Sequence, residues 1–315
     1  MRRFPPLPDL DAEEAPDDVL EGHLWLLELI DGSGLRFRMD DSGLLRFGGP
    51  EATYADLDAV PLALRPAVRR VRERFDREAL RSAVDDPAGV TFFGVATHRR
   101  GTDYDWDRLP SFLGTDVWVG GGGEADAGTT DGAFRPPDSV AAIFDGVGLD
   151  PVNAVAREVN ARDFDPDRYA VPASAWRDGP AAGVVVRNKR GGRGRIVRGV
   201  VDEGDDDRAE SGDPADAGSG DSVDSDELAA THAGRERFER IVAGLERRGD
   251  PATVDALADR TIEAVARETS LRFGTEHSGP AGIDVARFRA SVVERARAFL
   301  DDRRAGDHGG ASGSE

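Results

Sequence analysis

The stretch that decides the fold runs from Leu24 to Gly34 and reads Leu-Trp-Leu-Leu-Glu-Leu-Ile-Asp-Gly-Ser-Gly. Its first seven residues are apolar except for Glu28, which predicts a buried strand, and the Asp-Gly-Ser-Gly that follows is a turn signal. Residues 35–39 predict a second strand, residues 40–43 a turn, and residues 44–47 a third strand. Together these segments predict a meander of antiparallel strands.

Further along the chain, helical and strand patterns alternate. Apolar residues recur at helical spacing over residues 61–84, which predicts one helix. Residues 90–97 and 115–119 predict strands, and residues 120–132 form a Gly-rich, acidic loop. We expect residues 139–144 and 151–160 to be helical. Residues 183–187 and 195–201 predict a hairpin whose turn contains Lys189.

Composition divides the chain into two domains. Residues 1–201 hold the predicted sheets, whereas residues 202–226 consist almost entirely of Asp, Glu, Gly, Ser and Ala and predict a disordered linker. Residues 227–304 then carry three helical patterns, centred on Phe238, Leu257 and Val292, which predict a small helical domain. The polar tail at residues 305–315 is expected to be disordered.

The chain is strongly acidic and nearly free of lysine. Its net charge is −20, and 41 Lys and Arg residues include a single lysine, Lys189. This balance is typical of a cytoplasmic protein of a salt-loving organism, where salt screens self-repulsion; an ordinary acidic protein from a GC-rich genome is the alternative. It argues against strong electrostatic binding to nucleic acid in dilute buffer but leaves room for a local basic groove.

Several classes of site are excluded or disfavoured by residue types. The chain has no cysteine, so it can form neither a disulfide framework nor a thiolate metal site. The five histidines are scattered without ligand spacing, so we expect no metal site. No apolar run approaches the roughly 20 residues that span a membrane. The loop at residues 120–123 follows a strand, but it lacks the Lys-Ser/Thr and helix of a phosphate loop.

Three segments carry a family resemblance when taken together. The first is residues 27–33, Leu-Glu-Leu-Ile-Asp-Gly-Ser. The second runs from Phe92-Phe93-Gly94-Val95 through Tyr104-Asp105-Trp106 to residues 110–117, Pro-Ser-Phe-Leu-Gly-Thr-Asp-Val. The third is residues 183–187, Gly-Val-Val-Val-Arg, followed by residues 193–197, Arg-Gly-Arg-Ile-Val. In this order and spacing the chain resembles the RNA ligase family of covalent nucleotidyltransferases, which also includes DNA ligases and mRNA capping enzymes.

The resemblance implies both a fold and a chemistry. The fold is α+β: a ligase-type, ATP-grasp-like nucleotidyltransferase domain of antiparallel sheets with flanking helices, followed by a small helical domain. In the family a lysine amine attacks the α-phosphate of ATP, AMP passes to a 5′-phosphate, and a 3′-hydroxyl displaces it. Such steps require an unprotonated amine, cations and a divalent metal such as Mg²⁺ around the phosphates.

Most positions that carry this chemistry are substituted here. The nucleophilic lysine of the family falls on Leu29, the ribose-binding glutamate on Val95 and the metal-supporting glutamate on Ala182. The aromatic residue that stacks on adenine falls on Thr115. Two phosphate-binding lysines fall on Arg193 and Arg195, and arginine is a better bidentate phosphate ligand than lysine.

The positions that shape turns and strands are kept. They are Asp31, Gly32, Gly94, Asp116 and Gly183. The resemblance therefore implies an RNA-ligase-like protein that has lost lysyl-AMP chemistry. Nucleotide and RNA or DNA ends are its candidate ligands, and no cofactor is assigned to it in this form.

Two alternatives stay open. The chain is an active ATP-dependent RNA ligase with an atypical site, in which Lys189 acts as a displaced nucleophile and ATP and Mg²⁺ are cofactors. Otherwise it is a structural partner in an RNA-repair complex. A solvated turn residue is the simpler interpretation of Lys189.

The densest basic stretch admits two interpretations as well. It consists of Arg187, Lys189, Arg190, Arg193, Arg195 and Arg198. Arg187, Lys189, Arg193 and Arg195 are candidates for a phosphate or nucleic-acid contact, since alternating residues of a strand such as Arg193 and Arg195 share one face. A solvated hairpin that balances the acidic linker is equally compatible. A second basic and aromatic patch follows His98, where an edge loop with half-buried aromatic rings is the simpler expectation. Glu28 is expected to pair with an arginine such as Arg36.

Overall fold

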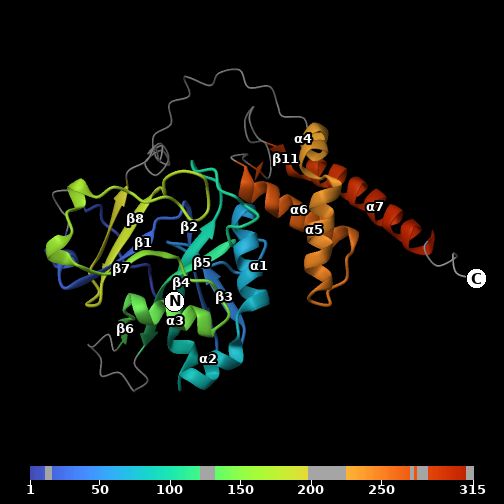
Figure 1. Ribbon diagram of the computed structural model, residues 1–315. Helices are drawn as coiled ribbons and strands as arrows, with labels where there is room; N and C mark the ends of the chain where they lie inside the picture. Colours follow the sequence, from blue (N-terminus) through green and yellow to red (C-terminus); the bar gives the residue numbers. More distant parts are fainter. Residues whose placement is uncertain (11–15, 121–131, 198–224, 270–272, 275–282, 310–315) are drawn as a thin grey trace, which may run out of the picture. The chain divides into compact units, whose positions relative to one another are not determined.

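The computed structural model describes residues 1–10, 16–120, 132–197, 225–269, 273–274 and 283–309. The chain divides into two compact units, Met1–Asp207 and Arg208–Glu315 (Figure 1). The first unit contains two antiparallel sheets with flanking helices and the second is mainly helical, so the predicted α+β class is confirmed. None of the described helices is long and apolar enough to cross a lipid bilayer.

The larger sheet of the first unit has five strands in the order β3-β2-β4-β5-β6, all antiparallel neighbours. The strands are β2 Gly32–Met39, β3 Leu45–Gly48, β4 Val90–Thr97, β5 Phe112–Gly120 and β6 Gly132–Phe134. One face packs on helices α1 Arg65–Arg74, α2 Arg77–Ala83 and α3 Pro137–Gly146 through a core that includes stacked Phe37 and Phe92.

The smaller sheet has four antiparallel strands in the order β7-β1-β8-β9. They are β1 His23–Glu28, β7 Ala154–Asn160, β8 Gly183–Asn188 and β9 Arg193–Val197. One face is covered by an apolar cluster around Leu24, Val184 and Ile196. Short 3-10 helices lie at Asp17–Leu20, Leu62–Leu64, Pro87–Gly89, Ala161–Asp163 and Pro166–Arg168.

The predicted meander is wrong at its first connection. β1 and β2 do not pair, because β1 lies between β7 and β8 in the four-stranded sheet, whereas β2 lies between β3 and β4 in the other. The backbone N–H of Leu29 donates to the carbonyl of Gly183, and Gly32 is already paired with Thr97. Residues 29–31 therefore carry the chain from one sheet to the other.

The single helix predicted at residues 61–84 is two helices. Phe75 and Asp76 have extended backbones between α1 and α2, and the Asp76 carboxylate accepts hydrogen bonds from the backbone N–H groups of Glu78 and Ala79. A side-chain cap of this kind starts a new helix. The apolar spacing continues across the break because both helices pack on the same sheet face.

The helix predicted at residues 151–160 is wrong, since these residues contain the edge strand β7. Its pairing with β1 shifts register twice, between Leu24 and Leu26 and between Leu26 and Leu27. Glu158 has a φ of 55°, the only positive φ among the described non-glycine residues. Such irregularities break the alternation that marks a strand, and the remaining apolar spacing resembled that of a helix.

The predicted hairpin is confirmed as β8 and β9, with β9 beginning at Arg193 rather than Arg195. Residues 198–201 of the predicted hairpin, residues 121–131 of the Gly-rich loop and residues 202–224 of the predicted linker lie outside the described residues. The last two residues of that linker begin a helix, α4 Ser225–His232.

The second unit contains the three predicted helices, α5 Arg235–Glu246, α6 Val254–Glu268 and α7 Val285–Gly309, with a two-stranded parallel pair of β10 Phe273–Gly274 and β11 Ile283–Asp284. Phe238 of α5 packs on Phe299 of α7, and Arg237 pairs with Glu268 at 2.6 Å. The predicted tail from Ala305 begins inside α7, which runs to Gly309, and residues 310–315 lie outside those described.

We predict that Gly32→Ala destabilises the first unit by about 1–3 kcal/mol, as expected when a well-packed site is overfilled. A Cβ atom at Gly32 would lie 2.5 Å from the Ala96 carbonyl oxygen and 2.7 Å from Val95 Cγ1. Urea unfolding measures the change. Gly101→Ala is the control, because a Cβ atom there meets nothing within 4 Å; equal effects of the two substitutions would contradict the prediction.

Candidate functional site

The position expected for the nucleophile lies at the exit of β1. Leu29 is half-buried, and its backbone N–H donates to the Gly183 carbonyl at 3.0 Å. Its Cδ2 atom lies 3.1 Å from where a Cβ atom on Gly183 would be. Ala182, buried next to Gly183, completes this group, so the fold brings these three motif positions together. None of the three side chains has a nucleophilic or acidic atom.

Val95 lies on β4, next to Gly32 at the end of the segment that joins the two sheets. Its Cγ1 atom would lie 2.7 Å from a Cβ atom on Gly32, and its side chain packs against an apolar cluster. That cluster draws Leu27 from the four-stranded sheet and Leu113 from the five-stranded sheet. Apolar packing therefore takes the place that the resemblance assigns to a ribose-binding carboxylate.

Asp31 has a structural use in this chain. One of its carboxylate oxygens accepts hydrogen bonds of 2.9 Å from the backbone N–H groups of Gly101 and Thr102. Its own N–H donates to the hydroxyl of Tyr104, a residue whose pKa is raised chiefly by burial. Asp31 thus fixes the crossing between the sheets to the loop that follows β4.

The expected pair of Glu28 with Arg36 is wrong, because the two residues lie in different sheets. Glu28 is 1% exposed, and its carboxylate accepts from Ser174 Oγ at 2.5 Å, Asn153 Nδ2 at 2.9 Å and the Ala175 N–H at 3.1 Å. Three neutral donors satisfy the carboxylate, and this network ties β1 to residues 153 and 174–175.

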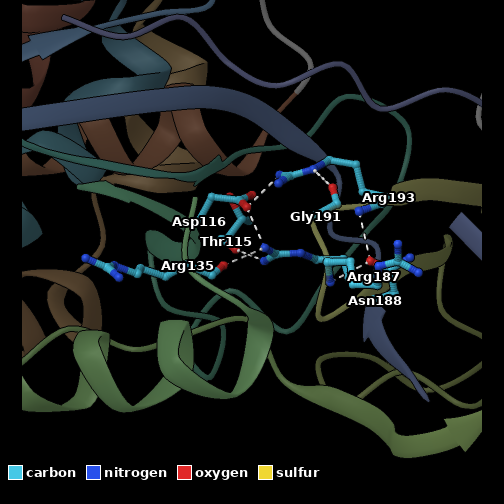
Figure 2. A network of polar contacts seen from close by, with 9 residues as sticks. Thr115, Asp116, Arg135, Arg187, Asn188, Gly191 and Arg193 are labelled. Atoms are coloured by element: carbon cyan, nitrogen blue, oxygen red, sulfur yellow. Dashed lines mark hydrogen bonds and ion pairs between the residues drawn. The ribbon is translucent and has the colours of Figure 1, made fainter. Parts of the chain in front are cut away.

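Two of the expected phosphate ligands instead form a buried ion-pair network (Figure 2). Asp116 Oδ1 lies 2.8 Å from an Nη atom of Arg187 and 2.6 Å from one of Arg193. Arg187 also donates to the carbonyls of Thr115 at 2.7 Å and Arg135 at 3.2 Å. One carboxylate therefore holds two guanidinium groups.

The network is almost sealed from water. The side chains of Arg187 and Arg193 are 3% and 8% exposed, and that of Asp116 is 11% exposed. Burial lowers the pKa of Arg187, Asp116 raises it, and Arg193 lowers it again. The guanidinium of Arg193 also lies 4.8 Å above the ring of Phe134. Since two positive charges share one negative charge, the network retains a formal charge of +1.

The remaining residues of the basic stretch have acidic partners. Arg195 lies on the same face of β9 as Arg193, but its Nε atom is 2.5 Å from Asp9 Oδ1, and the pair is 40–45% exposed. Arg190 pairs with Glu21 at 2.5 Å. Lys189 Nζ lies 2.7 Å from Glu158 Oε1 and 3.7 Å from Asp138. Arg198 lies outside the described residues.

The basic and aromatic residues that follow β4 contact neighbouring side chains of the same unit. The Tyr104 ring is buried and packs edge-to-face on the half-buried Trp106 ring at 5.6 Å. His98 Nε2 is 2.8 Å from Ser33 Oγ, and Arg99 is 3.7 Å from Asp103. In the described part of the chain, no three His, Asp or Glu side chains gather closely enough to hold a metal ion.

Comparisons with known proteins give structural likenesses only. No protein-family model and no curated protein sequence matches the chain. The form 2 structure of an archaeal ATP-dependent RNA ligase is similar, with 12% identity and a TM-score of 0.42 over 96% of this chain and 65% of that one. The form 1 structure gives 13% identity and a TM-score of 0.43 over 97% and 67%.

A Naegleria gruberi RNA ligase variant with ATP and Mn is also similar, with 13% identity and a TM-score of 0.45 over 62% of this chain and 56% of that one. The chain thus spans between 56% and 67% of the length of these three ligases.

Sequence reasoning missed the partners of the arginines. Asp116 was singled out as a kept motif position, yet its pairing with Arg187 and Arg193 joins residues more than 70 positions apart. No local pattern marks such a pair, although an Asp inside an otherwise apolar strand, Phe112–Gly120, is itself a sign that a buried cation lies opposite.

We predict that Asp116→Asn costs about 3–5 kcal/mol of folding free energy, because it leaves two buried guanidinium groups facing each other without a counter-charge. Asp9→Asn is the matched control: it breaks the exposed pair with Arg195 and should cost less than about 1 kcal/mol. Urea unfolding measures the free energy of unfolding of both variants. A similar small loss in both would show that the buried network contributes little to stability.

Proposed function

We propose that this chain is an RNA-ligase-like protein without lysyl-AMP chemistry that binds RNA ends non-covalently. The proposal rests on what surrounds two residues, Leu29 and Lys189. Leu29 occupies the nucleophile position beside Gly183, and it offers only hydrocarbon. Lys189, the single lysine, lies elsewhere and is engaged in ion pairs.

Lys189 is poorly suited to replace the missing nucleophile. It follows the end of β8 at Asn188, whereas Leu29 contacts the beginning of β8 at Gly183. Six residues at about 3.3 Å each separate the two ends by about 20 Å. A hydrogen bond with Glu158 chiefly raises the pKa of Lys189, with Asp138 adding to the effect. A raised pKa keeps the amine protonated, and a protonated amine cannot attack phosphorus.

The side chains at the other motif positions do not fit ATP with a divalent metal as the family would hold them. Val95 and Ala182 supply no oxygen ligand for a ribose hydroxyl or a magnesium ion, and Mg²⁺ requires oxygen ligands. Val95 also packs into the apolar cluster between the sheets. We therefore derive no catalytic step through ATP or Mg²⁺.

Among the residues expected to contact phosphate, Arg195 is the best candidate for binding RNA. Arg187 and Arg193 are buried on Asp116, so they act as internal structure. Arg195 is 44% exposed, and its pair with Asp9 is of the exposed kind that contributes about 1 kcal/mol or less. A phosphate can therefore displace Asp9 at small cost.

We expect no covalent label when the protein is incubated with α-labelled ATP and magnesium or manganese in concentrated salt. The physical reason is the absence of an amine at position 29. Denaturing electrophoresis after the incubation measures the label, with an active ATP-dependent ligase as positive control. Label on the wild-type protein that disappears in Lys189→Arg would overturn the proposal and identify an active enzyme with a displaced nucleophile.

Arg195→Ser should weaken binding to a nicked RNA duplex several-fold, because one phosphate contact is lost. Fluorescence anisotropy at several salt concentrations measures the affinity. Arg168→Ser is the control, since Arg168 is 88% exposed and pairs with Asp165 within its own turn. If the wild-type protein does not bind the duplex, the chain is better explained as a structural partner; if both variants bind alike, Arg195 makes no contact.

A further inference from the structure

A second group of arginines lies on the five-stranded sheet, away from the basic stretch of β8 and β9. Residues 8–10 extend the four-stranded sheet, where the Leu10 N–H donates to the Arg195 carbonyl at 2.8 Å. The preceding residues lie on the open face of the other sheet: the ring of Phe4 packs on Phe93 at 5.0 Å. This path brings Arg2 and Arg3 to the arginines of β2.

Arg36 of β2 is a buried cation that has no counter-ion among the described residues. It is 3% exposed, and its Nε atom is buried without a hydrogen-bond partner. One Nη atom donates to the carbonyl of Arg2 at 3.0 Å. Among the described residues, no carboxylate lies within ion-pair distance of Arg36, in contrast to the two arginines on Asp116. A buried charge of this kind is costly unless something pairs with it.

Several neighbouring charges have the same sign. Burial chiefly lowers the pKa of Arg36, Arg3 lowers it further, and Tyr54 raises it. Arg38 lies directly opposite Arg46 across the β2–β3 pair, and like charges placed so repel each other. Arg46 is neutralised by Asp40 at 2.8 Å, whereas Arg2, Arg3 and Arg38 have no ion pair among the described residues.

An aromatic ring completes the surface. The guanidinium of exposed Arg2 lies 4.1 Å above the ring of Trp118 on β5. Arginines interleaved with an aromatic side chain on one sheet face are typical of surfaces that bind single-stranded nucleic acid, where phosphates meet the cations and bases stack on the rings. Guanidinium groups also bind phosphate through paired hydrogen bonds.

We propose that Arg2, Arg3 and Arg38, with the buried Arg36 behind them, form a phosphate-binding site that contacts the backbone of an RNA strand. The inference rests on the proposed RNA binding and assigns it a second contact surface. A phosphate on the three outer arginines brings a negative charge close to Arg36, which has no carboxylate partner in the described part of the chain.

The test measures the affinity of the full-length protein for a fluorescein-labelled single-stranded RNA of 12 nucleotides by anisotropy, at several potassium chloride concentrations. The double variant Arg3→Gln/Arg38→Gln changes only side chains that are not fully buried, so the fold is retained. We expect at least tenfold weaker binding and a slope of log K against log salt that is smaller by about 1.4, since each phosphate contact on a single strand contributes about 0.7.

The matched control is Arg162→Gln/Arg168→Gln, which removes the same charge from two exposed arginines of the short helices after β7. A loss of affinity confined to the first double variant supports the site. Equal losses in both, or no loss in either, overturn the inference while the proposed function stands. A wild-type protein that binds no RNA overturns the inference together with the binding half of the proposed function, whereas covalent labelling by ATP affects the proposed function alone.

Arg36→Gln provides a second signature. Removing a buried charge that has no carboxylate partner among the described residues should leave the thermal midpoint unchanged or raise it, while RNA affinity falls; a lowered midpoint with unchanged affinity would mark Arg36 as purely structural. Competition by ATP at equal phosphate concentration separates the two sources of phosphate. If RNA stays bound in the presence of ATP, the site prefers a polynucleotide backbone. If ATP displaces RNA from the wild-type protein by binding at Arg3 and Arg38, the site prefers a free nucleotide.

Discussion

The joint between the two sheets of the first unit depends on Asp116. Its carboxylate, on β5 of the larger sheet, binds Arg187 of β8 and Arg193 of β9 in the smaller one. Burying three charged groups carries a large desolvation cost, which is recovered only when the geometry is good and the other donors are satisfied. Arg187 meets that condition, since its two Nη atoms also donate to the carbonyls of Thr115 and Arg135. Three strands, β5, β8 and β9, therefore meet at this one carboxylate.

This constraint explains the division of the motif positions into two groups. Asp31 and Gly183 each have a visible structural use: the first ties the crossing to the next loop, and the second leaves room for the close approach of the Ile196 carbonyl. Leu29 and Val95 fall on positions to which the resemblance assigns reactive groups, and both make apolar contacts. The first group holds the fold in place, and the second contributes apolar packing.

Local patterns predicted what local interactions determine. The strand at residues 24–28 and the β8–β9 hairpin could be predicted from the sequence, because each depends on neighbours in the chain. The edge strand β7 was hidden by its two register shifts, and the placement of β1 and β2 in different sheets depends on partners far away in the sequence. The arginine surface was missed because it forms only when the first residues of the chain lie across β2.

The distribution of arginine and lysine follows from the same geometry. Arg187 uses a rigid planar fork to reach a carboxylate and two carbonyls from one buried position. The ammonium of lysine is a compact point charge that cannot present donors in that arrangement. Lys189 instead lies in an exposed turn and bridges Glu158 and Asp138, a task that either cation performs. Arginine is thus required by geometry at Arg187, whereas the single lysine lies in a turn whose ion pairs either cation could form.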